Sequence, residues 1–217
     1  MAKTVNPPRP TRREQAAATK ERMMRAAIEV FTESGYVGAR MGDIADRAGV
    51  AVQTVYFTFH TKAELLQACF DFAVLGPEQL PPTEQSFYSE LTAARSGRAA
   101  LAAFVRGNTA ILERSAAIKE VADSAPHEPD AAAVVARSEH LRRDGLAQIV
   151  SLLADRFGLR PGLTGEDATD LLLTLSSSAT YLSLQRYGWS DEKYAAWLTD
   201  TLARQLLAQP GQRRRER

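Results

Sequence analysis

The chain has few residues of the kinds that build disulfides or metal centres. Its 217 residues include a single cysteine, Cys69. A lone cysteine excludes an internal disulfide and any cysteine-rich metal site. Its position in the apolar stretch AELLQACFDF predicts that it fills a hydrophobic core.

Long hydrophobic runs are missing as well. No run of about eighteen apolar residues occurs, which argues against a membrane-spanning helix, and the first residues, MAKTVNPPRPTRRE, lack the apolar region of a secretory signal. We therefore expect a cytoplasmic protein without a membrane partner. The alternation of apolar and polar residues that is typical of strands is also missing, so the predicted fold class is all-α.

Histidine is scarce, and its positions do not support catalysis. His60, His127 and His140 are scattered, and none lies at a metal-ligand spacing or beside a serine or cysteine nucleophile. His140 belongs to the stretch SEHLRRD, which is typical of a solvated helix face. Phosphate-loop and dinucleotide motifs are missing too. We predict a protein that is not an enzyme, with no catalytic residues, cofactor or metal.

The formal net charge is only +1, but the charges are unevenly distributed. Basic residues exceed acidic ones over residues 1–62 and 211–217, and acidic residues exceed basic ones between them. A basic end on an acidic body is typical of a protein of which one part contacts a polyanion. The pattern predicts a disordered basic arm over residues 1–13 and a disordered basic tail over 211–217. The arm either follows DNA or has no role.

Apolar residues recur at helical spacing from residue 14 onward. Thr11 and Glu14 predict a capping box at the start of the first helix, and Gly35 predicts its end. Thr61 and Glu64 predict a second capping box. The stretch LGPEQLPP predicts a boundary between an N-terminal domain with its connecting helix and a larger C-terminal domain. These two domains span residues 14–76 and 77–210. In the second domain, helices are predicted over residues 97–125, 130–158, 165–187 and 191–208.

Residues 41–59 have the spacing of a helix-turn-helix. Two short helices that cross steeply need a small residue at their contact, which suits Ala45. The tight turn between them favours a positive φ, which suits Gly49. Val55 then packs between the two helices. We predict helices over residues 41–48 and over the segment that follows Gly49.

The second helix of this pair predicts an outward face that fits a DNA major groove. If Val55 points inward, a turn of about 100° per residue places Gln53 and Phe57 outward, with Thr54 and Tyr56 beside them. Gln53 can bridge two atoms of an adenine, and Phe57 can contact a thymine methyl group. From the sequence, Tyr56 either contacts DNA or packs on a neighbouring helix.

Residues 26–66, AAIEVFTESGYVGARMGDIADRAGVAVQTVYFTFHTKAELL, resemble the N-terminal domain of the tetracycline-repressor (TetR) family of bacterial transcription regulators. The shared features are an apolar first helix ending in Phe, then Gly-Tyr, Ile-Ala and Ala-Gly-Val, a Tyr in the recognition helix, and Phe and Lys before a Leu-rich helix. The resemblance implies a repressor that binds a palindromic double-stranded operator as a homodimer and is released by a small-molecule effector.

The resemblance also implies which residues contact DNA. In the family, a Tyr, a Lys and the start of the second helix bind phosphates, and the recognition helix contacts bases. The phosphate contacts then fall on Tyr56, Lys62 and the corner Arg40, Met41 and Gly42. The contacts from the recognition helix fall on Val52, Gln53, Thr54, Phe57 and Thr58. Arg40 and Met41 replace threonines that are common in the family, so a side-chain cap is lost and Arg40 offers a charged contact.

Residues 77–210 resemble the family in helix order and in the sequence YGWSDEKYAAWL. The resemblance implies effector binding in this region and dimerisation through the last two helices. The residues agree, because the segment 171–185 has no charge and the final helix has an apolar stripe. The alternative function is a DNA-binding regulator that acts constitutively or through a protein partner, without an effector.

One polar residue, Asn108, lies on the otherwise apolar stripe of the segment 97–125. A buried amide costs free energy unless it is hydrogen-bonded, either by a neighbouring helix or by a ligand. We predict an effector pocket around it. The candidate lining residues are Phe72, Tyr88, Phe104, Asn108 and Tyr181.

Overall fold

The computed structural model describes residues 11–208, and its regular structure is helical. The elements are α1 (Arg12–Gly38), α2 (Met41–Ala48), α3 (Val52–Phe59), α4 (Lys62–Leu75), a 3-10 helix η1 (Pro82–Glu84), α5 (Ser86–Ala93), α6 (Gly97–Asp123), α7 (Pro129–Phe157), α8 (Gly165–Leu175), α9 (Ser178–Arg186) and α10 (Asp191–Leu206). No β-strand occurs within residues 11–208, which confirms the all-α class.

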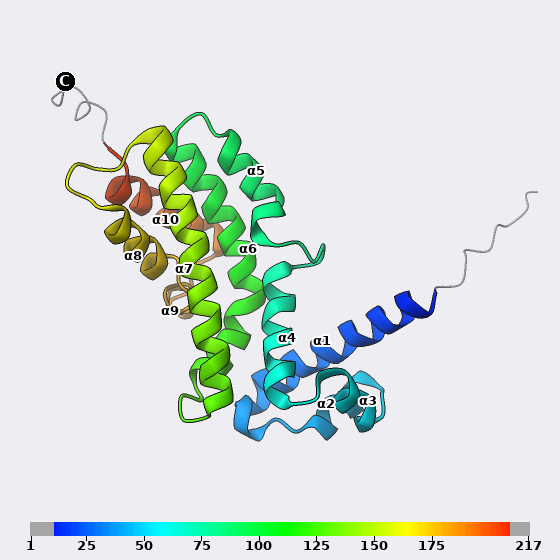
Figure 1. Ribbon diagram of the computed structural model, residues 1–217. Coiled ribbons are helices and arrows are strands. Elements are labelled where there is room, and N and C mark those ends of the chain that lie inside the picture. The colour runs from blue at the N-terminus through cyan, green and yellow to red at the C-terminus, as the bar shows by residue number, and fades with distance from the viewer. Residues whose placement is uncertain (1–10, 209–217) are drawn as a thin grey trace, which may run out of the picture.

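The long helices α6 and α7 run side by side, with α1–α3 at one end of them and α5, α8 and α10 toward the other (Figure 1). The N-terminal half of α1 extends away from this body (Figure 1). In the part of the chain that the structure describes, no helix combines the length and the hydropathy needed to cross a membrane.

Helix α1 begins with the predicted capping box. Thr11 Oγ1 accepts a hydrogen bond from the Glu14 N–H (3.2 Å), and the Glu14 carboxylate accepts one from the Thr11 N–H (2.6 Å). Because the cap lies at Thr11, Arg12 and Arg13 form the first turn of the helix. This corrects the predicted arm, which extended to residue 13. The remainder of that arm, residues 1–10, and the tail 211–217 lie outside the described residues.

Glycines with positive φ interrupt the chain where the sequence predicts helix ends. Gly35 (φ 69°, ψ 172°) kinks α1, which continues beyond the kink to Gly38. Gly49 (φ 66°, ψ 41°) caps α2 in the left-handed region, and its N–H donates to the carbonyls of Ala45 and Asp46. Residues with a Cβ adopt this conformation at a cost, so Gly49 sets the tight turn between α2 and α3.

The core of the helix-turn-helix extends into the rest of the molecule. Ile44 and Val55 are completely buried between α1, α2 and α3, and Cys69 of α4 is buried in the same cluster as predicted. Burial raises the pKa of the Cys69 thiol, so this thiol stays protonated at neutral pH. Ile118 of α6 and Ala131 of α7 belong to the cluster too. The first four helices therefore share one core with the adjoining ends of α6 and α7.

The predicted helix over residues 165–187 is wrong at its centre. The chain breaks there into α8 and α9, because serine hydroxyls compete with the helical backbone for hydrogen bonds. Ser176 Oγ donates to the Leu172 carbonyl (2.6 Å), and Ser177 Oγ accepts from the Thr180 N–H (3.2 Å) and so caps α9.

The LGPEQLPP stretch separates helices as predicted. Helix α4 ends at Leu75, Gly76 follows with φ 72°, and η1 comes next. Helix α5 lies just beyond this stretch and was not among the predicted helices. A second apolar cluster is formed by α5, α6, α7, α8, α9 and α10. Because α6 and α7 contribute to both clusters, the division into residues 14–76 and 77–210 stays a proposal.

Helix α5 packs so closely on α6 that a methyl group at Gly107 has no room. A Cβ at Gly107 would lie 2.1 Å from Cγ of Phe87. We expect Gly107→Ala to lower the free energy of unfolding by about 1–3 kcal/mol. Gly145 of α7 is the matched control because a Cβ there meets no atom within 4 Å. Gly145→Ala should raise the free energy of unfolding by about 0.5–1 kcal/mol. Urea unfolding measures both, and equal effects would contradict the contact.

Candidate nucleic-acid interface and ligand cavity

The outward face of α3 is uncharged and partly aromatic. Val55 is buried, so the helix turns its opposite side outward: Phe57 is 84% exposed and Tyr56 is 50% exposed. Gln53 is exposed beside them. The face therefore presents an amide, a phenol and an apolar ring, with no carboxylate on α3 to repel a phosphate. The sequence left two roles for Tyr56, contact with DNA or packing on a neighbouring helix. Because Tyr56 is half-exposed, its position favours the contact with DNA.

Other predicted contact residues of α3 are less accessible. Val52, Thr54 and Thr58 are half-buried. Val52 packs against the first apolar cluster. Thr58 Oγ1 donates to the Thr54 carbonyl (2.8 Å), so a phosphate would have to replace this bond. Their contacts with DNA stay a prediction.

The start of α2 lies near this face, and its three predicted residues differ in accessibility. Arg40 and Gly42 are exposed, and Arg40 provides no side-chain cap, as predicted. Met41 is 6% exposed, so its side chain is closed to DNA, and a contact of Met41 through its backbone N–H stays a prediction. The reason is the helical period, because Met41 lies three and four positions before the buried Ile44 and Ala45 and joins their apolar stripe.

Lys62 makes its contacts within the protein. Its Nζ donates to the Tyr36 carbonyl (2.7 Å) and lies 3.4 Å from the carbonyl oxygens of Val37 and Ala39. It also lies 4.5 Å from the centre of the Tyr36 ring. Carbonyls at a helix end lack backbone partners and carry partial negative charge, so an ammonium group stabilises them. Lys62, the first residue of α4, thereby ties α4 to the end of α1. A phosphate contact of Lys62 stays a prediction.

The other end of α4 is held by side chains as well. Arg114 of α6 donates from Nε to the Ala73 carbonyl (3.0 Å). Gln85 Nε2 donates to the carbonyls of Leu75 (3.3 Å) and Leu80 (2.9 Å). Helix α4 is therefore fixed to α1 at one end and to α6 and the following loop at the other.

A cavity of about 770 Å³ lies between α4, α5, α6 and α7. This volume is in the range of small-molecule sites in proteins, and most of the lining is apolar, as such sites require. The apolar lining includes Phe70, Val74, Leu75, Phe87, Leu112 and Ile149. In residues 11–208, no group of three or more His, Cys, Asp or Glu side chains is arranged to hold a metal.

Three of the predicted pocket residues, Tyr88, Phe104 and Asn108, line this cavity, and two do not. Phe72 faces α1, where Arg25 lies over its ring at 5.2 Å. It is two positions from the cavity residue Phe70, which turns it by about 200° to the opposite side of α4. Tyr181 is buried elsewhere and donates from its hydroxyl to Asp191 (2.9 Å). The same periodicity would have identified Phe70 and Val74 as lining residues.

Asn108 has a partner inside the protein. Its Nδ2 donates to the Ser176 carbonyl (3.2 Å). Of the two partners considered from the sequence, a neighbouring helix and a ligand, the first is therefore present. The same oxygen accepts a bond from Arg142 Nη2 (2.6 Å). Arg142 lines the cavity although it lies in the SEHLRRD stretch that was predicted to be a solvated face. His140 of that stretch is exposed, whereas Arg142 is partly buried.

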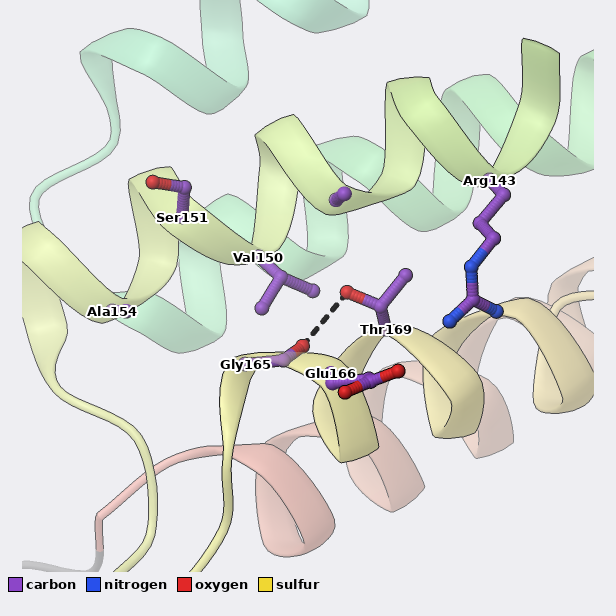
Figure 2. Close-up of a pocket in the computed structure, with 8 residues that line it drawn as sticks. Arg143, Val150, Ser151, Ala154, Gly165, Glu166 and Thr169 are labelled. Carbon is purple, nitrogen blue, oxygen red and sulfur yellow. Dashed lines mark hydrogen bonds between the residues drawn. The ribbon is translucent and has the colours of Figure 1, made fainter. Parts of the chain in front are cut away.

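A smaller hollow of about 430 Å³ lies between α7 and α8 (Figure 2). Thr169 donates to the Gly165 carbonyl at its edge (2.8 Å), and Arg143 pairs with Asp170 (2.5 Å). These two polar side chains are therefore already bonded within the protein.

The fold and the α3 face define a helical protein with an N-terminal helix-turn-helix. Residues 23–69 match the family model described as "Bacterial regulatory proteins, tetR family". The uncharacterized HTH-type transcriptional regulator TtgW of Pseudomonas putida is 37% identical over 91 residues, which cover 42% of this chain and 63% of TtgW. The match thus spans less than two thirds of that relative. Over its N-terminal region the chain is therefore similar to the tetR family of bacterial regulatory proteins.

Solved structures share the arrangement of helices over most of the chain. NalD, described as the secondary repressor of the MexAB-OprM multidrug efflux pump in Pseudomonas aeruginosa, has a TM-score of 0.68 at 21% identity, covering 91% of this chain and 100% of NalD. FadR from Bacillus subtilis, solved in complex with stearoyl-CoA, has a TM-score of 0.66 at 17% identity, covering 84% of this chain and 96% of FadR.

The contacts of Lys62 within the protein predict that its removal lowers stability. A lysine that served only to bind a DNA phosphate would have no such effect. Lys62→Ala removes a charged donor from the end of α1 and should lower the free energy of unfolding by about 1–3 kcal/mol. Arg40→Ala is the control, because Arg40 is exposed and makes no side-chain cap, and it should change stability by less than about 0.5 kcal/mol. Denaturant unfolding without DNA compares them. Equal stability of Lys62→Ala and wild type would contradict the structural role.

Proposed function

We propose that this protein is a transcriptional repressor that binds a palindromic DNA operator as a homodimer and is released by a small molecule. The observation that carries the DNA-binding part is the exposed, uncharged face of α3 on a helix-turn-helix. The match of residues 23–69 to the family of regulatory proteins supports regulation of transcription, and the similarity to the repressor NalD supports the sign of that regulation.

In this proposal, α3 enters the major groove. Gln53 reads an adenine through its amide, Phe57 contacts a thymine methyl group, and Tyr56 reaches a phosphate. The first turn of α2 adds free backbone N–H groups and the positive charge of Arg40. These contacts divide into base reading by Gln53 and Phe57 and backbone positioning by Tyr56 and Arg40.

The homodimer forms through the last two predicted helices, residues 165–187 and 191–208. In the structure the first of these corresponds to α8 and α9, and the second to α10. Apolar side chains on these helices remain half-exposed in the single chain, among them Leu171, Leu182 and Trp197. Burying such area in a two-fold contact is favourable. A two-fold dimer carries two α3 helices, which suits an inverted repeat.

The cavity supplies the site for the small molecule, and α4 links it to the DNA-binding helices. Phe70 and Val74 of α4 line the cavity, whereas Lys62 of the same helix bonds the end of α1. A ligand that favours another position of α4 therefore changes the placement of α1 and the helix-turn-helix. Coupling of this kind is typically worth about 1–3 kcal/mol. The FadR complex with stearoyl-CoA shows that a related fold holds an organic ligand.

Two substitutions separate base reading from backbone positioning. Gln53→Ala should cost about 1–3 kcal/mol mainly at one base position of the operator, because it removes one hydrogen-bonding pair. Arg40→Ala should weaken all sequences alike and reduce the salt dependence of binding by about one unit of slope. Binding of both variants to a library of operator sequences at several salt concentrations measures this. Identical profiles across the library would contradict the division of roles.

A further inference from the structure

Arg142 lines the cavity, and its guanidinium contacts the C-terminal end of α8. Its Nη1 donates to the Leu173 carbonyl (3.3 Å), and its Nη2 donates to the carbonyl (2.6 Å) and hydroxyl (2.8 Å) of Ser176. These groups lie at the C-terminal end of α8. The Nε–H has no acceptor among residues 11–208, although Arg142 lines the cavity.

The positive charge of Arg142 has no carboxylate partner. In the described part of the chain, no carboxylate oxygen lies within 4.0 Å of its nitrogens, and the nearby Glu139 pairs instead with Lys119 (3.2 Å). Burial lowers the pKa of the Arg142 guanidinium, but arginine stays protonated at any physiological pH. The end of α8 offsets at most about half an elementary charge. The charge of Glu139 favours the protonated guanidinium through space, but no carboxylate touches Arg142, so its positive charge has no ion-pair partner in direct contact.

The acidic residues of the cavity lining are already engaged elsewhere. Asp71 accepts a bond from Gln67 (2.7 Å), Glu139 pairs with Lys119, and Asp144 lies 3.5 Å from His140. None of them compensates the Arg142 charge by an ion pair within residues 11–208.

Hydrogen-bond donors gather around Arg142. Asn108 and Arg142 share the single Ser176 carbonyl as acceptor. Tyr194 Oη is completely enclosed and has no partner in residues 11–208. Desolvation raises the pKa of Tyr194, and the positive charge of Arg142 opposes part of this rise. The carboxamide oxygen of Asn108 adds an acceptor but no negative charge.

We propose that the effector is an organic anion with an apolar body, whose carboxylate is bound by Arg142 while its body lies against the apolar lining from α4, α5 and α6. The inference rests on the proposed function, because it names the chemical class of the effector. The carboxylate accepts a hydrogen bond from the free Nε–H and gives Arg142 an ion-pair partner in direct contact. The apolar body covers side chains such as Phe70, Val74 and Leu75, which are only half-buried in the cavity wall.

The test compares probes that differ only in the head group. Octanoate, decanoate, dodecanoate and para-butylbenzoate are titrated against the full chain, together with their primary amides and the matching primary amines, by calorimetry and thermal shift. At least one carboxylate should bind, and its amide should bind at least about tenfold more weakly, with the amine weaker still. Equal or tighter binding of the amide or amine, or no binding of any carboxylate, would overturn the proposal.

Arg142→Gln removes the charge and should weaken the best carboxylate by at least about tenfold while leaving the affinity of its amide within about threefold. The control is Arg143→Gln, an arginine of the same helix that pairs with Asp170 and is not part of this cavity lining, and it should change neither affinity. Carboxylate affinity that survives Arg142→Gln would overturn the assignment. If this variant does not fold, the comparison of carboxylate with amide on the wild type decides alone.

The two proposals fail in different ways. Amides or amines that bind the wild type and release it from operator DNA would retain the effector function and overturn the anionic class. If no probe of any head group changed the melting temperature or the affinity for DNA, the anionic class would be overturned and the regulator without an effector would be favoured.

Discussion

The carbonyl groups at helix ends, which have no backbone partner, are the constraint on which this structure depends. Cationic side chains from other helices bond these carbonyls at four helix ends. Lys62 bonds the end of α1, Arg114 that of α4, Arg142 that of α8, and Arg156 that of α5 through the carbonyls of Thr92 and Ala94. Because each bond joins two different helices, the groups that complete one helix also fix its position relative to another.

This constraint explains how a cavity and a DNA-binding face are connected in one small chain. Helix α4 has one side on the cavity and both ends in such bonds, so its position is shared between the two regions. The first apolar cluster strengthens the link, because it contains residues of α1–α4 together with the ends of α6 and α7. A displacement of α4 by a ligand has to be accommodated by the helix-turn-helix, since packed cores do not deform continuously.

The N-terminal helices could be predicted because their signals are local. The cap at Thr11, the glycine turn at Gly49 and the apolar period around Val55 depend on neighbours within a few residues, and the structure confirms each of them. The outward position of Phe57 follows from the same period. The same period places the Met41 side chain inward, so the resemblance can hold at that position only through the backbone.

The C-terminal region was predicted less well because its determinants are distant in sequence. Arg142 looks like a surface residue until the end of α8, about thirty positions later, is placed beside it. The helix breaks at Ser176 because side-chain hydrogen bonds compete with backbone ones. The spacing of apolar residues, from which the helix was predicted, carries no information about this competition. Tyr181 was predicted to line the pocket, but its hydroxyl donates to Asp191 at the start of α10, a contact that the local sequence pattern does not reveal.

The most direct test of the central claim is selection of double-stranded DNA from a random library by the purified chain, followed by sequencing. The account predicts an enriched inverted repeat whose half-sites lie about one or a few helical turns of roughly ten base pairs apart, because two α3 helices of a two-fold dimer enter separate major grooves. Phe57→Asp should abolish the enrichment without unfolding the protein, since that side chain is 84% exposed. An enriched site without two-fold symmetry, or one that survives this substitution, would contradict the account.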